Sequence, residues 1–162
     1  MKIKVGEKLP SNDFFILDEN SVVKKINSIT LFKNQKVILI GVPGAFTKVC
    51  SAKHLPGYVT NFEEIKKRGV TNIVCVSVND PNVMKAWGEI LNVKGKVFMA
   101  ADPFCEFTKL IGADVDKSSK GLGIRSVRYT MLVEDEIVRK IKVEKDTGIC
   151  EISAADNFIK DI

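Results

Sequence analysis

The stretch KVILIGVPGAFTKVC, residues 36–50, decides how this chain folds and where its chemistry lies. Lys36 to Val42 is an unbroken apolar run rich in β-branched residues, which predicts a strand buried on both faces of a central sheet. A turn follows, and helical spacing takes over from about Val49. Cys50 therefore stands at a helix start, where unpaired backbone N–H groups and the helix dipole favour a thiolate.

The length and composition of the chain limit what this stretch can belong to. A chain of 162 residues can form one domain, spanning residues 1–162, that buries a core without disulfides or a structural metal. The longest apolar runs are far shorter than the roughly 20 residues that cross a bilayer. Residues 1–7 contain lysines but no continuous apolar segment of a signal peptide. We therefore expect a cytoplasmic protein with no membrane partner.

Charge and cysteine spacing argue against two further classes of partner. The net charge of +5 is spread along the chain and aromatic residues make up only 7%, so we expect no stacking groove for nucleic acid. The four cysteines form no CxxC pair, and the chain has only one histidine. The usual spacings of metal ligands are therefore absent from the sequence. We expect neither nucleic acid, nor a metal, nor a cofactor.

The segments after Cys50 alternate between helix and strand. Apolar spacing predicts a helix over 49–67, kinked or divided at Leu55-Pro56-Gly57, and then a strand over 73–78. Asp80 and Pro81 open the next helix, which runs to about residue 91. We further expect a strand over 97–101, a helix over 103–111, a polar loop over 114–126, an antiparallel hairpin of 127–134 and 137–143 turning at Asp135 and Glu136, and a helix over 154–160 capped by Ser153.

This order of elements predicts an α/β fold. Extended segments through Asn34 precede a βαβ half, and a hairpin and a helix follow it. That is the order of the thioredoxin architecture. We expect a thioredoxin-like fold with an N-terminal extension, an insertion, and a central mixed sheet flanked by helices.

Three residues of the turn after the first strand point to one site. Thr47 and Cys50 are three residues apart, so the hydroxyl and the sulfur lie on the same side of a first helical turn. Pro43 ends the strand, and its ring can shield a thiolate from water without leaving a buried N–H unpaired. The spacing indicates a shielded, activated sulfur.

These residues resemble a known family. Pro43, Thr47 and Cys50 reproduce the PxxxTxxC motif of peroxiredoxins, and PGAFT, CS, HLPGY and SVNDP in that order resemble the type II, peroxiredoxin-5-like branch. The resemblance spans nearly the full chain, and Arg128 in RYTM matches the active-site arginine of the family. It implies a homodimeric antioxidant enzyme that reduces H2O2 and alkyl hydroperoxides and serves redox homeostasis.

The resemblance also implies a role for each site residue. Cys50 attacks a peroxide oxygen as a thiolate and becomes a sulfenic acid. Thr47 hydrogen-bonds the peroxide, as do the backbone N–H groups of Val49 and Cys50, while Arg128 stabilises the thiolate and the developing charge. Pro43 packs over the pocket. Arg125 competes with Arg128 for the arginine role, or lines the mouth of the pocket.

Two neighbours of Cys50 leave other interpretations open. His54 lies four residues on, which allows a Cys-His hydrolase, although no Asp or Asn to orient the ring is identifiable. Lys48 replaces a proline that family members often carry, and its charge can favour the thiolate or attract the carboxylates of glutathione, or simply face solvent. A further alternative is a redox sensor or holdase-type protein that uses Cys50 without turnover.

The sequence leaves the recycling of Cys50 open. Cys75 matches a cysteine that some type II proteins join to the reactive one, and it also fits a buried core position. Cys150 lies one residue from the place where other type II proteins carry a resolving cysteine, and Cys105 is most simply a packing residue. The leading interpretation is one essential cysteine recycled by glutathione, glutaredoxin or thioredoxin, with an intramolecular disulfide as the alternative.

Overall fold

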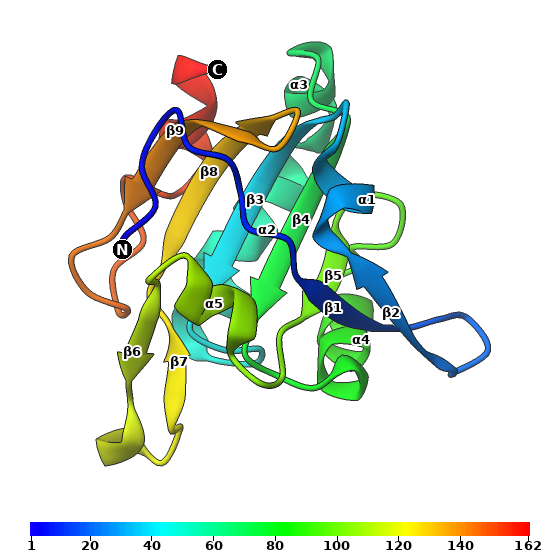
Figure 1. The fold of residues 1–162 in the computed structure, drawn as a ribbon, viewed down its shortest axis with the longest axis vertical. Helices are drawn as coiled ribbons and strands as arrows, with labels where there is room; N and C mark the ends of the chain where they lie inside the picture. Colours follow the sequence, from blue (N-terminus) through cyan, green and yellow to red (C-terminus); the bar gives the residue numbers. More distant parts are fainter.

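Three parallel strands form the centre of the sheet in the computed structural model, which describes residues 1–162 except for the side chain of Asp161. They are β3 (Lys36–Val42), β4 (Asn72–Ser77) and β5 (Phe98–Ala101). β4 lies between the other two and pairs in parallel with both (Figure 1). β3, the predicted apolar run, is buried along all but its first residue. The strand that leads to Cys50 is thus an inner strand of the seven-stranded sheet, between β4 and β8.

Antiparallel strands complete the sheet on both sides, which makes it mixed as the sequence predicted. β8 (Tyr129–Glu134) pairs with β3, and β9 (Ile137–Val143) follows at the edge. Asp135 and Glu136 join these two strands with positive φ angles of 47° and 67°, as a tight hairpin turn requires. The N-terminal extension supplies β1 (Asp13–Leu17) and β2 (Val23–Asn27) at the other edge, followed by α1 (Ser28–Phe32).

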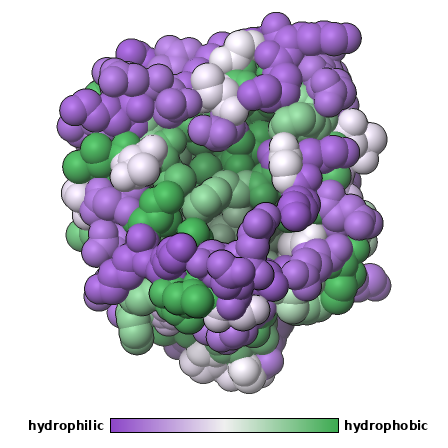
Figure 2. All heavy atoms as spheres, turned by 90° about the vertical axis from the view of Figure 1, so that its right-hand side faces the viewer, coloured by the Kyte–Doolittle hydropathy of each residue, from purple (hydrophilic) through white to green (hydrophobic). Residues whose placement is uncertain are grey.

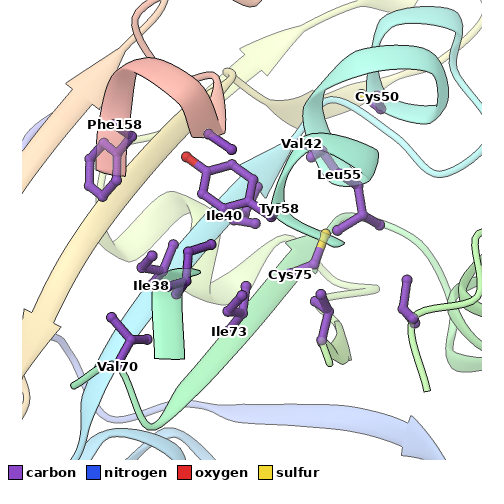
Figure 3. Packing of buried hydrophobic residues seen from close by; sticks show 14 of the residues in the cluster. Ile38, Ile40, Val42, Cys50, Leu55, Tyr58, Val70, Ile73, Cys75 and Phe158 are labelled. Carbon is purple, nitrogen blue, oxygen red and sulfur yellow. The ribbon is translucent and has the colours of Figure 1, made fainter. Parts of the chain in front are cut away.

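Helices cover both faces of the sheet, and the face that carries the site is the more heavily covered. Apolar side chains of four helices share one buried cluster with Ile38, Ile40 and Cys75 (Figure 3). These helices are α2 (Leu55–Thr60), α3 (Phe62–Lys67), α4 (Pro81–Ile90) and α6 (Ala155–Phe158). The other face packs against α1 and α5 (Glu106–Leu110). Along β4, Ile73 and Cys75 belong to the first cluster and Val74 and Val76 to the second, so successive side chains alternate between the two faces.

The predicted helix over 49–67 is present in three pieces. A π-helical turn, η1 (Cys50–His54), passes into α2 next to Pro56, which is the division that the sequence predicted. A second break lies at Asn61, whose side chain donates to the Gly57 carbonyl oxygen, and α3 begins after it. The sequence prediction missed this second break because nothing but a polar residue marks it.

Three other expectations are corrected by the structure. The predicted loop over 114–126 contains a small hairpin of β6 (Asp114–Asp116) and β7 (Ile124–Ser126), with a 3-10 turn, η2 (Ser118–Lys120), between them. The helix expected over 103–111 is shorter, because Cys105 has a left-handed φ of 59° and precedes it; the Asp102 carboxylate accepts the N–H groups at its start. Ser153 does not cap α6, which begins after Ala154 and continues into η3 (Ile159–Asp161).

A hollow with apolar walls opens on the side of the molecule that carries β1, β2 and α4 (Figure 2). A cavity of about 680 Å³ lies between the end of β1, β5 and α4. β1 pairs with β5 only at Phe15 and Ala101, and the two strands part beyond that pair. None of the residues that line this cavity belongs to the 43–50 segment, so the cavity is separate from the turn that carries Cys50.

Two properties of the described residues bear on partners. No described helix has the length and apolar character needed to cross a membrane. Within the same residues, no three His, Cys, Asp or Glu side chains gather closely enough to hold a metal ion.

Candidate active site

The turn between β3 and η1 carries Cys50 to the carboxyl end of the central strand. Pro43, Gly44 and Ala45 are buried, and the Ala45 N–H donates to Asn79 Oδ1 at 2.9 Å. Phe46 has a φ of 62°, which is unusual for an aromatic residue, and its side chain is 51% exposed. The chain is thus turned sharply just before the helix, and Cys50 is fully buried.

Thr47 occupies the start of this helix and bonds back to the turn. Its hydroxyl donates to the Gly44 carbonyl oxygen at 2.9 Å, and its own carbonyl oxygen accepts from the Ser51 N–H at 3.0 Å. Because its single proton is directed at Gly44, the lone pairs of Thr47 Oγ1 are available to a donor that approaches from the site. Val49 and Cys50 lie in the first turn, where backbone N–H groups have no earlier helical carbonyl.

Arg128 brings a buried guanidinium to the sulfur from the residue before β8. Its Nη2 donates to Cys50 Sγ at 3.3 Å and to the Thr147 carbonyl oxygen at 2.8 Å, and its Nη1 bonds to His54 Nδ1 at 3.1 Å. Arg128 is only 1% exposed, and its Nε has no hydrogen-bond partner among the residues that the structure describes. The predicted pairing of Arg128 with Cys50 is therefore present in the structure.

Among the described side chains, no carboxylate forms an ion pair with Arg128. Glu144 lies near enough for Arg128 to affect its pKa, but forms no ion pair with it. A buried cation is costly unless an anion and hydrogen bonds compensate it. The Cys50 sulfur, bonded to Nη2, is the group that can supply this negative charge.

His54 holds the other end of the guanidinium. Because arginine only donates, His54 Nδ1 must be the acceptor, so the proton of the neutral ring is on Nε2, 3.2 Å from both Ser153 O and Thr130 Oγ1. Burial, together with the charge of Arg128, lowers the pKa of His54 to about 3. Neither ring nitrogen is free to take a proton from Cys50, so the geometry does not support Cys-His hydrolysis.

A buried network extends from His54 and was not foreseen from the sequence. The Ser153 carbonyl oxygen accepts from Tyr58 Oη at 2.7 Å and from Thr130 Oγ1 at 3.0 Å. Tyr58 is one turn beyond His54, and that spacing was the only available signal. The network fixes the imidazole ring, and through it the guanidinium of Arg128.

The remaining candidates lie at different distances from the reactive sulfur. Lys48 is exposed two residues before Cys50, and the Arg125 guanidinium lies close to Gly44 and Thr47. The four cysteines are free and buried. Cys75 lies within the sheet on the same face as Cys50 (Figure 3), where burial and the charge of the Cys50 sulfur raise the pKa of the Cys75 thiol.

Cys150 and Cys105 are also protected. Burial raises the pKa of the Cys150 thiol, against the opposing influence of Arg128. Burial and then Asp102 raise the pKa of the Cys105 thiol, which belongs to the turn before α5. Of the four sulfurs, the one for which the described structure provides a guanidinium donor is Cys50.

A mixed sheet with a buried cysteine and arginine pair at its strand-to-helix junction defines a thiol-dependent redox enzyme with a thioredoxin-like fold. The Redoxin family model matches residues 4–159. Peroxiredoxin-2B of Arabidopsis thaliana is 43% identical over 158 residues, covering 98% of this chain and 97% of that protein.

Solved structures agree with this match. Reduced Prx3 of Vibrio vulnificus in complex with H2O2 superposes with a TM-score of 0.91 at 38% identity, and 98% of each chain is covered. Peroxiredoxin 5 of Alvinella pompejana gives a TM-score of 0.80 at 34% identity, covering 90% of this chain and 92% of that one. The chain belongs to the peroxiredoxin family, in its type II, peroxiredoxin-5-like branch, and is a thiol-dependent peroxidase.

Proposed function

We propose that Cys50 is the peroxidatic residue and reduces H2O2 and alkyl hydroperoxides. The Cys50 thiolate attacks one peroxide oxygen, the S–O bond forms as the O–O bond breaks, and the other oxygen leaves as hydroxide or alkoxide and takes up a proton. Sulfur loses two electrons and the peroxide gains them. The products are a sulfenic acid on Cys50 and water or an alcohol.

The neighbours of Cys50 stabilise this step. Thr47 Oγ1 accepts a hydrogen bond from the bound peroxide, because its own proton is directed at Gly44. Arg128 balances the charge of the thiolate and then of the departing oxygen, and its unpartnered Nε is a spare donor. The backbone N–H groups of Val49 and Cys50 bind the peroxide as well, and Pro43 walls the pocket from water.

An external thiol restores Cys50 in the proposed cycle. The thiol attacks the sulfenic sulfur, water leaves, and a second thiol releases Cys50 from the mixed disulfide. Glutathione, glutaredoxin or thioredoxin supplies these thiols. An internal disulfide with Cys75 or Cys150 is the alternative, and it requires a buried, protonated thiol to reach the sulfur.

The observation that carries this proposal is the 3.3 Å bond to Cys50 Sγ from a buried Arg128 that has no carboxylate partner among the described side chains. Peroxide consumption is measured with H2O2 and tert-butyl hydroperoxide, with each reductant supplied separately. Cys50→Ser protein is expected to lose consumption, and Cys105→Ser protein, changed in the turn before α5, to keep it. Stoichiometric consumption without turnover in every system contradicts the enzyme and favours the sensor or holdase.

The fate of the sulfenic acid is tested separately. After one equivalent of H2O2, nonreducing mass spectrometry is expected to find one added oxygen atom on Cys50 in the leading, one-cysteine cycle. A bridge from Cys50 to Cys75 or Cys150 contradicts that cycle and supports internal resolution. Cys75→Ser and Cys150→Ser proteins identify which of the two takes part.

We also propose that the enzyme acts as a homodimer in the cytoplasm. Exposed apolar side chains of Phe46, Ile124 and Ile149 flank the site residues, and such groups favour burial between copies.

The proposed location rests on the cysteines, because four free thiols suit a reducing compartment. Sedimentation equilibrium of wild-type and Phe46→Asp protein tests the dimer, since loss of association is expected for the variant, and cell fractionation tests the location.

A further inference from the structure

A second arginine lies against the turn that carries the reactive cysteine. Arg125 belongs to β7, opposite Val115, and its Nε donates to the Leu122 carbonyl oxygen at 2.8 Å. Its Nη1 lies 3.0 Å from the point where a Cβ on Gly44 would stand, and Thr47 Cγ2 lies equally close to that point. The guanidinium therefore rests on the glycine backbone beside Thr47, a position that a side chain at Gly44 would obstruct.

The two terminal nitrogens of Arg125 have no partner in the described part of the structure. The bond from Nε is the only hydrogen bond that its side chain makes there, and no described acidic side chain forms an ion pair with it. The residue is half-buried, and its guanidinium is held by the bond from Nε. A fixed fork with two free N–H edges is suited to bidentate binding of a carboxylate.

Further positive charge surrounds this position. Lys48 is exposed one residue after Thr47. Lys117 and Lys120, from the turn of the β6–β7 hairpin, lie close enough to Asp146 to lower its pKa, after the larger effect of the hydrogen bond from the Gly148 N–H. The hairpin thus brings positive charge toward the loop whose Thr147 carbonyl oxygen binds Arg128.

We propose that Arg125 is a carboxylate-binding residue at the mouth of the Cys50 site, which selects small molecules that carry a carboxylate near the reacting group. This inference rests on the proposed function of Cys50. Two reactants of that cycle can carry such a group, namely the peroxide and the reducing thiol. The chemistry recognised is the same in both cases, because a carboxylate accepts two parallel hydrogen bonds from the terminal nitrogens of Arg125.

The experiment compares matched pairs of probes in the two half-reactions. Oxidation of the reduced enzyme is timed with linoleic acid hydroperoxide and with its methyl ester. Reduction of the oxidised enzyme is timed with glutathione and with glutathione diethyl ester. Each ratio of the acid rate constant to the ester rate constant is determined for wild-type, Arg125→Gln, Arg125→Lys and Lys48→Gln proteins.

We expect Arg125→Gln to lower at least one ratio by about ten- to a hundredfold, the effect of losing charge-assisted hydrogen bonds to a carboxylate. Arg125→Lys keeps the charge but loses the fork, so its ratio should lie between those of wild-type and Arg125→Gln protein. Lys48→Gln, which removes an exposed charge from the same turn, should leave both ratios within about twofold of wild type, since it tests the general field alone.

The outcomes distinguish the source of the carboxylate. A fall in the peroxide ratio assigns Arg125 to the substrate, and a fall in the glutathione ratio assigns it to the reductant. Both ratios remaining within about twofold of wild type in Arg125→Gln protein overturns the inference, as does an equal fall in Lys48→Gln protein. Failure of the proposed function shows differently, as continued peroxide consumption by Cys50→Ser protein.

Discussion

Arg128 and His54 together explain how a charge is kept in a place that water does not reach. The guanidinium uses Nη1 on His54 and Nη2 on Cys50 and Thr147, so two of its three nitrogens are hydrogen-bonded. His54 can accept from Arg128 only while it is neutral. The buried imidazole is therefore a fixed acceptor that orients Arg128, rather than a base for Cys50.

This assignment predicts a pH dependence of stability. The pKa of His54 is about 3 in the folded protein because of burial and the charge of Arg128, against about 6.5 when unfolded. The unfolded chain takes up a proton on its imidazole below pH 6.5 and the folded chain does not. The free energy of unfolding therefore decreases as the pH is lowered. Between pH 7 and pH 5 the free energy of unfolding should drop by about 2 kcal/mol from this residue. Urea unfolding measures it.

The chain contains one histidine, which makes the control direct. His54→Gln protein should be less stable at pH 7 and should lack this part of the pH dependence. An imidazole resonance of the folded protein that titrates near pH 6.5 contradicts the assignment. So does an equal pH dependence in the variant.

The shape of the Arg128 side chain yields a second prediction. Arg128→Lys keeps the positive charge, but a single ammonium cannot reach Cys50, His54 and Thr147 at the same time. The second-order rate constant for H2O2 should fall by about a hundredfold or more, the usual effect of losing a preorganised donor. Stopped-flow measurement checks this. Arg139→Lys, a half-exposed arginine on β9, is the matched control, and an equal loss there attributes the effect to handling of the protein rather than to the site.

The reactive residues were accessible from the sequence because their spacing is local. Thr47 and Cys50 lie on one turn, and the motif places them directly. The contact of Arg128 with His54 joins residues 74 positions apart, and the spacing within one helix showed only that His54 is near Cys50. The resemblance to the family identified Arg128, whereas the role of His54 is evident only from its contact with Arg128 in the folded structure.

At the scale of elements, long apolar runs were predictable and short polar ones were not. β3 and α4 have continuous or periodic apolar residues, and Asp80 accepts the Asn82 and Val83 N–H groups as predicted for a cap. β6 and β7 are three residues each, with little apolar pattern. These two strands pair with each other across the turn at η2, and the polar, glycine-bearing composition of the segment indicated only a loop. Arg125 is carried by one of these missed strands.

The segment between β9 and α6 depends on one carboxylate. Glu144 Oε1 accepts from the backbone N–H groups of Glu151 and Ser153 and from the Ser153 hydroxyl. These bonds close the loop that presents the Thr147 carbonyl oxygen to Arg128. Despite the opposing effect of burial, the hydrogen bonds lower the pKa of Glu144.

Glu144→Gln should loosen this loop. An amide keeps one acceptor oxygen but loses the charge, so we expect the free energy of unfolding to fall by about 1–3 kcal/mol at pH 7. The effect should shrink as the pH falls below the ordinary range of a glutamate, because the unfolded wild-type carboxylate is then protonated and the advantage of the folded anion is lost. Hydrogen exchange at the amides of residues 151 and 153 locates the change. Glu151→Gln, an exposed neighbour, should alter neither measurement.

At the scale of the whole molecule, the site is assembled from distant parts of the chain around the end of β3. The strand order β2-β1-β5-β4-β3-β8-β9 puts the segment with Cys50 at the centre and the strand after Arg128 beside it. α4 also contacts the segment that carries Cys50, because Trp87 Nε1 donates to Ser51 Oγ at 2.9 Å. The periodicity of apolar residues predicted the individual elements. Their arrangement in the sheet was predicted from the thioredoxin order of those elements.

Trp87 is the only tryptophan of the chain and is fully buried, which makes it an internal reporter of the site. Cys50 is also fully buried, so an oxygen atom added to its sulfur changes the packing of the first helical turn. That turn includes Ser51, whose hydroxyl accepts from Trp87. We therefore expect the emission of Trp87 to change at the rate of peroxide consumption when reduced enzyme meets one equivalent of H2O2, and to recover on reduction. Cys50→Ser protein should show no change, and Ser51→Ala protein a smaller one; constant emission while mass spectrometry records oxygen on Cys50 contradicts the coupling.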